Sequence, residues 1–523
     1  MFHPSLGKLH ALDPDPFVDY GACMSVSDAL HACTNMPVRL GLIAAGGLTA
    51  TEVGTYWDDS WHTDRGRDEF AIPPHLLLYG GVTVAAVAVA VWGLLAWRSA
   101  GWSLAGLRTV LGDPAMRLAG IGGVVTLASA PVDNWWHNTF GRDAVLWSPP
   151  HLAAVAGVLA LVVGLSAGLR TTVGTGARAA RLFAGAGVIG ALQVLVLEYD
   201  SGVPQFSTIW YLPVAALALC AAYALLDDLL PSRWGPAEAA LVYTLLRAGS
   251  VAFLSAFGFS LTIVPPLLIP LLALGLLAGL PLAARLVLLG AVSPLVWWPL
   301  LQWQSSVTTT VPASQLAAAV FLGIAGGLVV ALVHGDLRRG PVMTGGMRAA
   351  LILGMLVVVL AQTPGRAWAH DPGQGTEVQK VKLAVVRTSG QARLEMVIAA
   401  GCSGFEPLGV TARRAGQTRT GALKLTERPG GGCLAVGSVA GLSPGRWFVY
   451  AELKSSAGEA LEAWLPSSGD GGASEVRSLY APPPGGQEVG LRRVVGPGLL
   501  LISAGVLIAC LRLARRVSGE IPA

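Results

Sequence analysis

Residues 149–169 read PPHLAAVAGVLALVVGLSAGL, a run without aspartate, glutamate, lysine or arginine. A helix that crosses the hydrocarbon core of a bilayer needs roughly 20 consecutive, mostly apolar residues. About twelve windows of this character occur along the chain. The sequence therefore predicts an all-α polytopic membrane bundle with spans near 38–57, 74–97, 115–132, 151–169, 179–197, 209–226, 237–258, 262–281, 283–301, 313–333, 347–364 and 494–511.

The composition agrees with a membrane protein. Of the 523 residues, 53% are hydrophobic and only 13% are charged, and the mean hydropathy is +0.60, whereas a soluble domain carries about 25% charged residues. The net charge of +4, without a lysine- and arginine-rich run, excludes nucleic acid as a partner. Six cysteines in a chain of this length exclude a disulfide scaffold. The lipid bilayer is the expected partner.

The arginines indicate an orientation. They gather in alternate short loops, and such loops stay on the cytoplasmic side. We therefore expect a multi-pass protein of a bacterial-type cytoplasmic membrane. Residues 1–37 form an N-terminal cytoplasmic segment, and residues 494–523 form a membrane anchor with a cytoplasmic tail. The external loops are then 58–73, 133–150, 198–208 and 302–312.

One long polar segment, residues 370–490, follows the membrane domain 38–364 and is predicted to be external. Five stretches in it have the composition of β-strands and are separated by turns rich in glycine and proline: 378–387, 392–399, 408–412, 432–440 and 446–453. They predict a small β-sandwich of the immunoglobulin or cupredoxin kind. Its cysteines, Cys402 and Cys433, either form a disulfide in an oxidising compartment or stay buried as thiols.

Two of the external loops repeat one another, and each closes a helical hairpin, at 50–97 and at 115–169. Both contain Asp-x-x-Trp-His, Gly-Arg-Asp and Pro-Pro-His-Leu in this order. The first loop carries Asp58, His62 and His75 with the spacing Asp-x3-His-x12-His. The second carries the corresponding residues with the spacing Asp-x3-His-x13-His, and these are Asp133, His137 and His151.

The spacing predicts metal sites. An aspartate and a histidine four residues apart share one helix face, and the hairpin brings the second histidine back beside them. Two imidazoles and a carboxylate form a three-ligand set with open coordination positions, which suits copper, iron or zinc. The neighbouring charged residues could orient the ligands through hydrogen bonds, and these are Arg67, Asp68, Arg142 and Asp143. In a plainer interpretation, the loop tryptophans anchor the hairpins at the membrane interface and no metal binds.

Further polar residues interrupt the spans. Glu52 lies inside the first span, before Asp58, and a carboxylate there is a candidate outer ligand or proton relay. A hydrogen-bonded packing role is the alternative. Glu198 and Asp200 end the fifth span and could face the same site. Three residues on the opposite side are typical of a membrane interface, and these are Asp227, Asp228 and His334.

The repeated sets resemble those of the C subunit of the copper membrane monooxygenases, the particulate methane and ammonia monooxygenases. That family has Asp-x3-His-x12-His in an Asp-x-x-Trp-His…Arg-Asp…Pro-x-His context, and then Asn-x3-His-x13-His. Asp58, His62 and His75 match the first set in type and interval. The second set matches except that Asp133 replaces the asparagine, which adds a negative charge. The resemblance covers residues 50–155 and implies copper sites near the outer membrane face.

A second resemblance concerns the start of the external domain. Ala367-Trp368-Ala369 has the form of a signal-peptidase site, and cleavage there would make His370 an N-terminus. This looks like the start of the same family's cupredoxin-like B subunit, or of copper-resistance proteins, where the terminal histidine binds copper. Residues 371–490 contain no other histidine. An uncleaved helix leading into a domain without metal is therefore the alternative.

Taken together, these patterns predict a copper-dependent monooxygenase that oxidises a small apolar substrate, of the alkane or ammonia type, with dioxygen. Other monooxygenase subunits, or further copies of this chain, are the implied partners. The alternative function is copper transport or delivery without oxygenase activity, which requires polar ligands that reach the inner side. A third possibility is a non-catalytic subunit with structural metal ions.

Overall fold

The computed structural model describes most of the membrane domain and the β-domain. The ranges are 35–64, 71–140, 148–202, 206–259, 262–305, 307–339, 376–414, 417–467, 469–481 and parts of 494–514. Within them, the side chains at 62–64, 137–140, 335–339, 376, 414 and 417 are not described, which includes those of His62 and His137. Several predicted features lie wholly outside these ranges: residues 1–34, the span 347–364, His370, Arg67, Asp68, Arg142 and Asp143.

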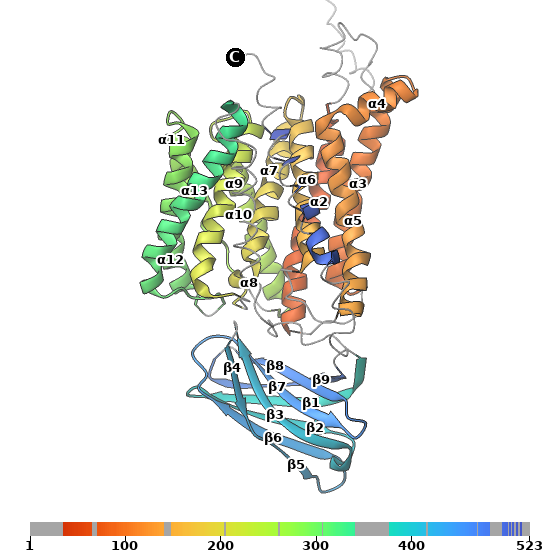
Figure 1. The fold of residues 1–523 in the computed structure, drawn as a ribbon, viewed down its shortest axis with the longest axis vertical. Helices are drawn as coiled ribbons and strands as arrows, with labels where there is room; N and C mark the ends of the chain where they lie inside the picture. The colour runs from red at the N-terminus through yellow and green to blue at the C-terminus, as the bar shows by residue number, and fades with distance from the viewer. Residues whose placement is uncertain are drawn as a thin grey trace, which may run out of the picture.

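A helical bundle forms the N-terminal part (Figure 1). Eight of its helical segments are long and apolar enough to cross a membrane, and they match eight predicted windows. The helices are α2 Val38–Asp64, α3 Pro73–Ser99, α4 Leu104–Gly112, α5 Pro114–Phe140, α6 Pro149–Leu169, α7 Ala177–Gln193, α8 Leu197–Asp200, α9 Tyr211–Leu229, α10 Gly235–Ala256, α11 Leu268–Leu276, α12 Leu282–Trp303 and α13 Leu316–Arg339.

Helix α2, the first predicted span, is a long helix that packs against α3 and α7 within the bundle. It is not among the eight apolar segments, because acidic residues such as Glu52, Asp58 and Asp59 interrupt its apolar sequence. The predicted span 38–57 is nevertheless helical throughout.

The prediction of a span at 262–281 is wrong. Only the nine residues of α11 are helical there, and residues 262–267 are not helical. Pro265 and Pro266 explain the difference, because proline lacks the backbone N–H that a helix needs. At the C-terminal end, the described part of the predicted span 494–511 is helical at 494–499 and 501–503.

The β-domain is a single antiparallel sheet of nine strands in the order β4-β3-β7-β8-β9-β1-β2-β6-β5. Five strands match the predicted ones, namely β1 Thr376–Thr388, β2 Gln391–Ile398, β3 Phe405–Arg414, β6 Cys433–Ala440 and β7 Trp447–Ser455. The prediction missed β4 Gln417–Gly421, β5 Leu423–Glu427, β8 Ala460–Ser467 and β9 Gly471–Ala481. A disulfide joins Cys402, after β2, to Cys433 at the start of β6.

The sheet forms a nearly closed barrel, and the prediction of a two-sheet sandwich is therefore wrong. Strands β4 and β5 are separated only by Ala422, yet β4 pairs with β3 and β5 pairs with β6. One continuous stretch thus joins both ends of the sheet and brings them together. The barrel encloses its own apolar core, which includes Leu383, Leu394 and Trp447.

The barrel lies at the end of the bundle where α2 and α5 finish and where α8 lies (Figure 1). Arg446 Nη1 donates a hydrogen bond to the backbone oxygen of Ser201, at 3.1 Å, and β8 contacts α2. The ends of both repeated hairpins and the β-domain therefore share one end of the molecule, as the alternation of the loops predicted.

Candidate functional site

The two repeated hairpins enclose a common cavity. It has a volume of about 190 Å³ and lies among α2, α3, α5, α6 and α7. Its walls are mainly apolar, with Leu78 from the first hairpin, Val155 and Val158 from the second, and Ala191 from α7. Five ionisable side chains from the predicted sites also line it, and these are Glu52, Asp58, His75, Asp133 and His151.

In the first hairpin, the carboxylate of Asp58 and the imidazole of His75 are in contact. Asp58 Oδ1 lies 3.1 Å from His75 Nε2, and the exposed fractions of the two side chains are 21% and 7%. Asp58 belongs to the last part of α2. His75 is in the first turn of α3, directly after the prolines at its first two positions, where the missing N–H groups cost no hydrogen bond.

The second hairpin repeats this pair. Asp133 Oδ1 lies 3.1 Å from His151 Nε2, and the exposed fractions of these side chains are 11% and 29%. His151 again follows two prolines at the start of a helix, α6. Here Ser148 also caps the helix, because its hydroxyl accepts a hydrogen bond from the backbone N–H of His151 at 3.4 Å.

Close helix packing holds each pair in place, and this packing is itself repeated. Gly47 in α2 and Gly122 in α5 each lie eleven residues before the aspartate. Gly81 in α3 and Gly157 in α6 each lie six residues after the histidine. A Cβ at Gly81 would come within 2.4 Å of the Gly47 oxygen, so the two backbones touch directly.

The partners in the second hairpin pack in the same way. A Cβ at Gly157 would come within 3.1 Å of the Gly122 oxygen. It would also meet the hydroxyl of Thr126 at 2.5 Å, as a Cβ at Gly81 would meet that of Thr51 at 2.6 Å. The sequence comparison of the loops missed this extension, although Gly-x3-Thr before each aspartate was readable as a signal.

The structure brings together one carboxylate and one imidazole of each predicted set. The third ligands, His62 and His137, have side chains outside the described part of the chain. Among the side chains that are described, no group of three or more histidine, cysteine, aspartate or glutamate residues could hold a metal ion. The ligand sets therefore remain predictions, of which the structure supports the pairing of Asp58 with His75 and of Asp133 with His151.

Glu198 and Asp200 were candidates for the same cavity, and the structure gives Asp200 different partners. Its carboxylate accepts a hydrogen bond from Tyr211 at 2.5 Å and pairs with Arg247 Nη2 at 3.0 Å. Arg247 is completely buried and also donates to the oxygen of Ile263 at 2.8 Å. The hydrogen bond from Arg247 satisfies a backbone oxygen of the non-helical segment 262–267. Buried backbone polar groups in a membrane domain need such partners.

At the opposite end of the bundle, the residues interpreted as typical of an interface form one buried pair and one partly buried pair. His334 Nε2 lies 2.7 Å from Asp228 Oδ2, with exposed fractions of 3% and 2% for the two side chains. Asp227 pairs with Arg285 through two hydrogen bonds, at 2.8 and 3.1 Å. These side chains connect α9 with α12 and α13 and do not line the cavity.

Comparison with known proteins finds no matching family, no matching curated protein and no matching solved structure.

Proposed function

We propose that this protein is a copper-dependent membrane oxidoreductase of the monooxygenase type that oxidises a small apolar substrate. The observation that carries the proposal is the shared cavity: two carboxylate–imidazole pairs from duplicated hairpins line one mainly apolar space. A polar pair in such a wall is costly unless its groups have partners or a cation. The spacing shared with the copper membrane monooxygenases favours copper as that cation.

The two described members of each ligand set are compatible with a shared cation. In each pair, an oxygen and a nitrogen lie 3.1 Å apart, so both atoms can approach one cation at the usual ligand distances of about 2.0–2.2 Å. Asp58 and His75 would hold one ion with His62, and Asp133 and His151 would hold another with His137. When bound there, copper would supply the redox chemistry that dioxygen requires.

The remaining side chains would control access to the site. The apolar walls would admit an apolar molecule and disfavour water. Aromatic residues cover the neighbouring face of α2: Trp57 lies 5.1 Å from Phe253, and Trp61 stacks on Phe259 at 5.7 Å between ring centroids. A cavity of about 190 Å³ limits the substrate to a small molecule, since an apolar cavity of about 150 Å³ accommodates benzene.

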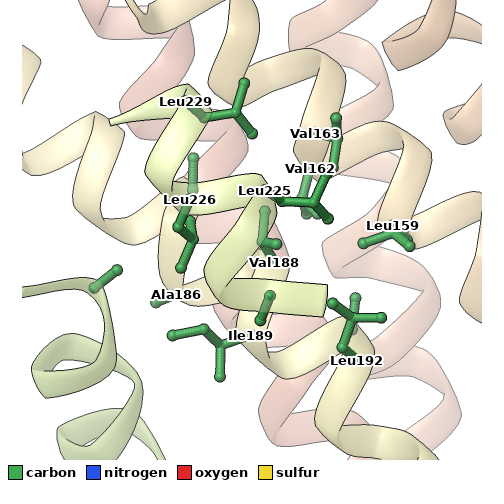
Figure 2. Close-up of a cluster of buried hydrophobic side chains, with 14 of the residues drawn as sticks. Leu159, Val162, Val163, Ala186, Val188, Ile189, Leu192, Leu225, Leu226 and Leu229 are labelled. Atoms are coloured by element: carbon green, nitrogen blue, oxygen red, sulfur yellow. The ribbon is translucent and has the colours of Figure 1, made fainter. Parts of the chain in front are cut away.

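Copper transport or delivery is the second candidate, and one observation favours it. The buried pair of Asp228 and His334 provides a third carboxylate–imidazole contact, at the far end of the bundle. However, buried apolar side chains of α6, α7 and α9 pack together in a layer next to the cavity, which one of them, Val162, also lines (Figure 2). Its members include Val162, Val188 and Leu225, all buried. Because a transport route needs polar ligands along its length, this layer favours the oxidoreductase.

Metal analysis of the purified protein in lipid or detergent tests the proposal. His75→Ala and His151→Ala should each lose one of two bound copper ions, and the double variant should lose both. His334→Ala separates the two functions: it should retain both ions in an oxidoreductase, whereas copper uptake into vesicles should fall in a transporter. Oxygen consumption with short alkanes or ammonia then measures the activity. Unchanged copper content in both single variants would reject the metal sites.

A further inference from the structure

A group of buried polar side chains lies beside the cavity, between α2, α7 and α10, which pack against one another. Glu52 comes from α2, Gln193 from α7, and Tyr243 and Arg247 from α10. Gln193 and Arg247 are 0% exposed. Glu52 belongs both to this group and to the cavity, because it lines the cavity wall.

Three members of this group have polar atoms that lack hydrogen-bond partners among the described residues. These atoms are Glu52 Oε1, Arg247 Nη1, and both Oε1 and Nε2 of Gln193. A buried polar atom without a partner costs about 1–3 kcal/mol, more when it is charged. Native proteins usually satisfy such groups with bound water, which makes about three hydrogen bonds at each site.

The known contacts of Arg247 show that it does not neutralise Glu52 by a direct ion pair. Its Nε and Nη2 atoms bond Ile263, Asp200 and Thr262, and its guanidinium stacks 3.5 Å from the ring centre of Tyr56. Only Nη1 is left to face further groups. Tyr56 lies one helical turn after Glu52 on α2, so the guanidinium is near the carboxyl group without bonding it directly.

Gly190 keeps α7 against Glu52. A Cβ at Gly190 would lie 3.4 Å from the carboxyl carbon of Glu52, and Gln193 follows three residues later, on the same face of α7. The carboxyl group of Glu52 thus lies at the cavity wall and directly against α7.

Glu52 also breaks the repeat. Its equivalent in the second hairpin, six residues before Asp133, is Leu127. Packing glycines, threonine, aspartate and histidine all recur in the second hairpin, and Glu52 does not. A role in the metal pairs that both hairpins share therefore does not explain this carboxyl group.

We propose that Glu52 exchanges protons between the cavity and water bound among Gln193, Arg247 and Glu52 itself. In the exchange, the Glu52 O–H bond breaks and the proton passes to an acceptor in the cavity, leaving a carboxylate that faces Arg247. A proton from the bound water then restores the acid, and the resulting hydroxide is neutralised by a proton from solvent. This proposal deepens the proposed function and rests on it, because reduction of dioxygen by the proposed monooxygenase would consume the proton.

The groups that face Glu52 define what can exchange with it. On α10 these are Arg247 and the hydroxyl of Tyr243, which lies 3.1 Å from that of Tyr56 on α2. On α7 it is Gln193, which does not titrate. Asp59 is a further ionisable group in the cavity wall. The carboxylates and imidazoles of the two pairs would be engaged as metal ligands, so the acceptor is the dioxygen that is reduced in the cavity.

Infrared difference spectroscopy of the full-length protein tests the proposal. A protonated carboxyl band should shift in D2O and should be absent in Glu52→Gln. Asp227→Asn is the matched control: this carboxylate pairs with Arg285 outside the group, so the variant should keep the band. Gln193→Leu should slow deuterium exchange of the band by roughly tenfold, the factor equivalent to loss of one hydrogen bond of about 1.4 kcal/mol.

Absence of any band that depends on Glu52 would overturn the proposal, and so would unchanged deuterium exchange in Gln193→Leu. Copper content measured on the same samples separates this result from the proposed function. Loss of the Glu52 band with normal copper content leaves the metal sites intact. A carboxyl band that depends on Glu52, in protein that binds no copper, would refute the metal sites but would still support proton exchange at Glu52.

Discussion

The packing of α2 against α3 yields a prediction that two adjacent glycines can test. Gly81→Ala places a methyl group 2.4 Å from the oxygen of Gly47 and 2.6 Å from the hydroxyl of Thr51. Gly80→Ala makes the same chemical change one residue earlier, where nothing lies within 4 Å. Both positions are in the middle of α3, so both variants gain the same helix propensity, about 1 kcal/mol.

The magnitude follows from the overlap. Non-bonded heavy atoms rest about 3.5–4.0 Å apart, so α2 and α3 must separate by roughly 1 Å to accommodate the methyl group. Overpacking of this kind costs about 1–3 kcal/mol. Since the propensity gain is common to both variants, Gly81→Ala should be less stable than Gly80→Ala by this amount. The separation of Asp58 from His75, now 3.1 Å, should increase with that of the helices.

Thermal unfolding and copper content of the two variants provide the assay. Gly81→Ala should unfold at a lower temperature than Gly80→Ala and should lose copper from the first hairpin. Gly157→Ala should lose it from the second hairpin instead, because its Cβ would meet Thr126. Equal unfolding temperatures for Gly80→Ala and Gly81→Ala would show that the helices do not touch as described. Equal copper loss from both hairpins in Gly81→Ala would refute the link between local packing and each pair.

Three further predictions concern the β-domain. Cys402→Ser should destabilise the barrel by roughly 3–4 kcal/mol, because the disulfide closes a loop with a sequence separation of 31. Hydrogen exchange in β2 and β6 of the full chain should rise, and unchanged exchange would contradict the disulfide between Cys402 and Cys433. Arg446→Ala removes the hydrogen bond to Ser201 and should increase proteolysis between bundle and barrel, whereas wild-type cleavage rates would show that this contact does not hold the barrel. Lys380 and a hydrogen-bonded serine lower the pKa of Glu377, so its stabilising contribution, present at neutral pH, should be lost as the pH falls through that lowered pKa. Glu377→Gln should therefore flatten the acid limb of barrel stability, by less than about 1 kcal/mol for so exposed a pair, and an identical acid limb in the variant would rule out the contribution.

The membrane bundle was largely predictable because each spanning helix satisfies its own backbone and needs an apolar sequence of nearly constant length. Eight windows agree with the structure for this reason. The prediction failed at 262–281, where hydropathy was high but Pro265 and Pro266 removed helical hydrogen bonds. The partner that supports this segment, Arg247, comes from the preceding helix and carried no signal in the sequence.

In the β-domain, alternation of apolar and polar residues identified five strands but not their arrangement. The alternation of side chains along a strand indicates which of them are buried, and this alternation is the same in a sandwich and in a barrel. The bend at Ala422, which lets one stretch pair with β3 and then with β6, depends on partners far away in the chain.

The sequence alone determined that the chain is a membrane protein, where most of its helices lie, and that two hairpins repeat an aspartate and two histidines. These properties are local, since they follow from composition, hydropathy and short spacings. Only the tertiary structure decided that both hairpins face one cavity and that Glu52 and Arg247 lie near one another. Such proximity depends on how helices distant in the sequence pack together, and no single segment encodes that packing.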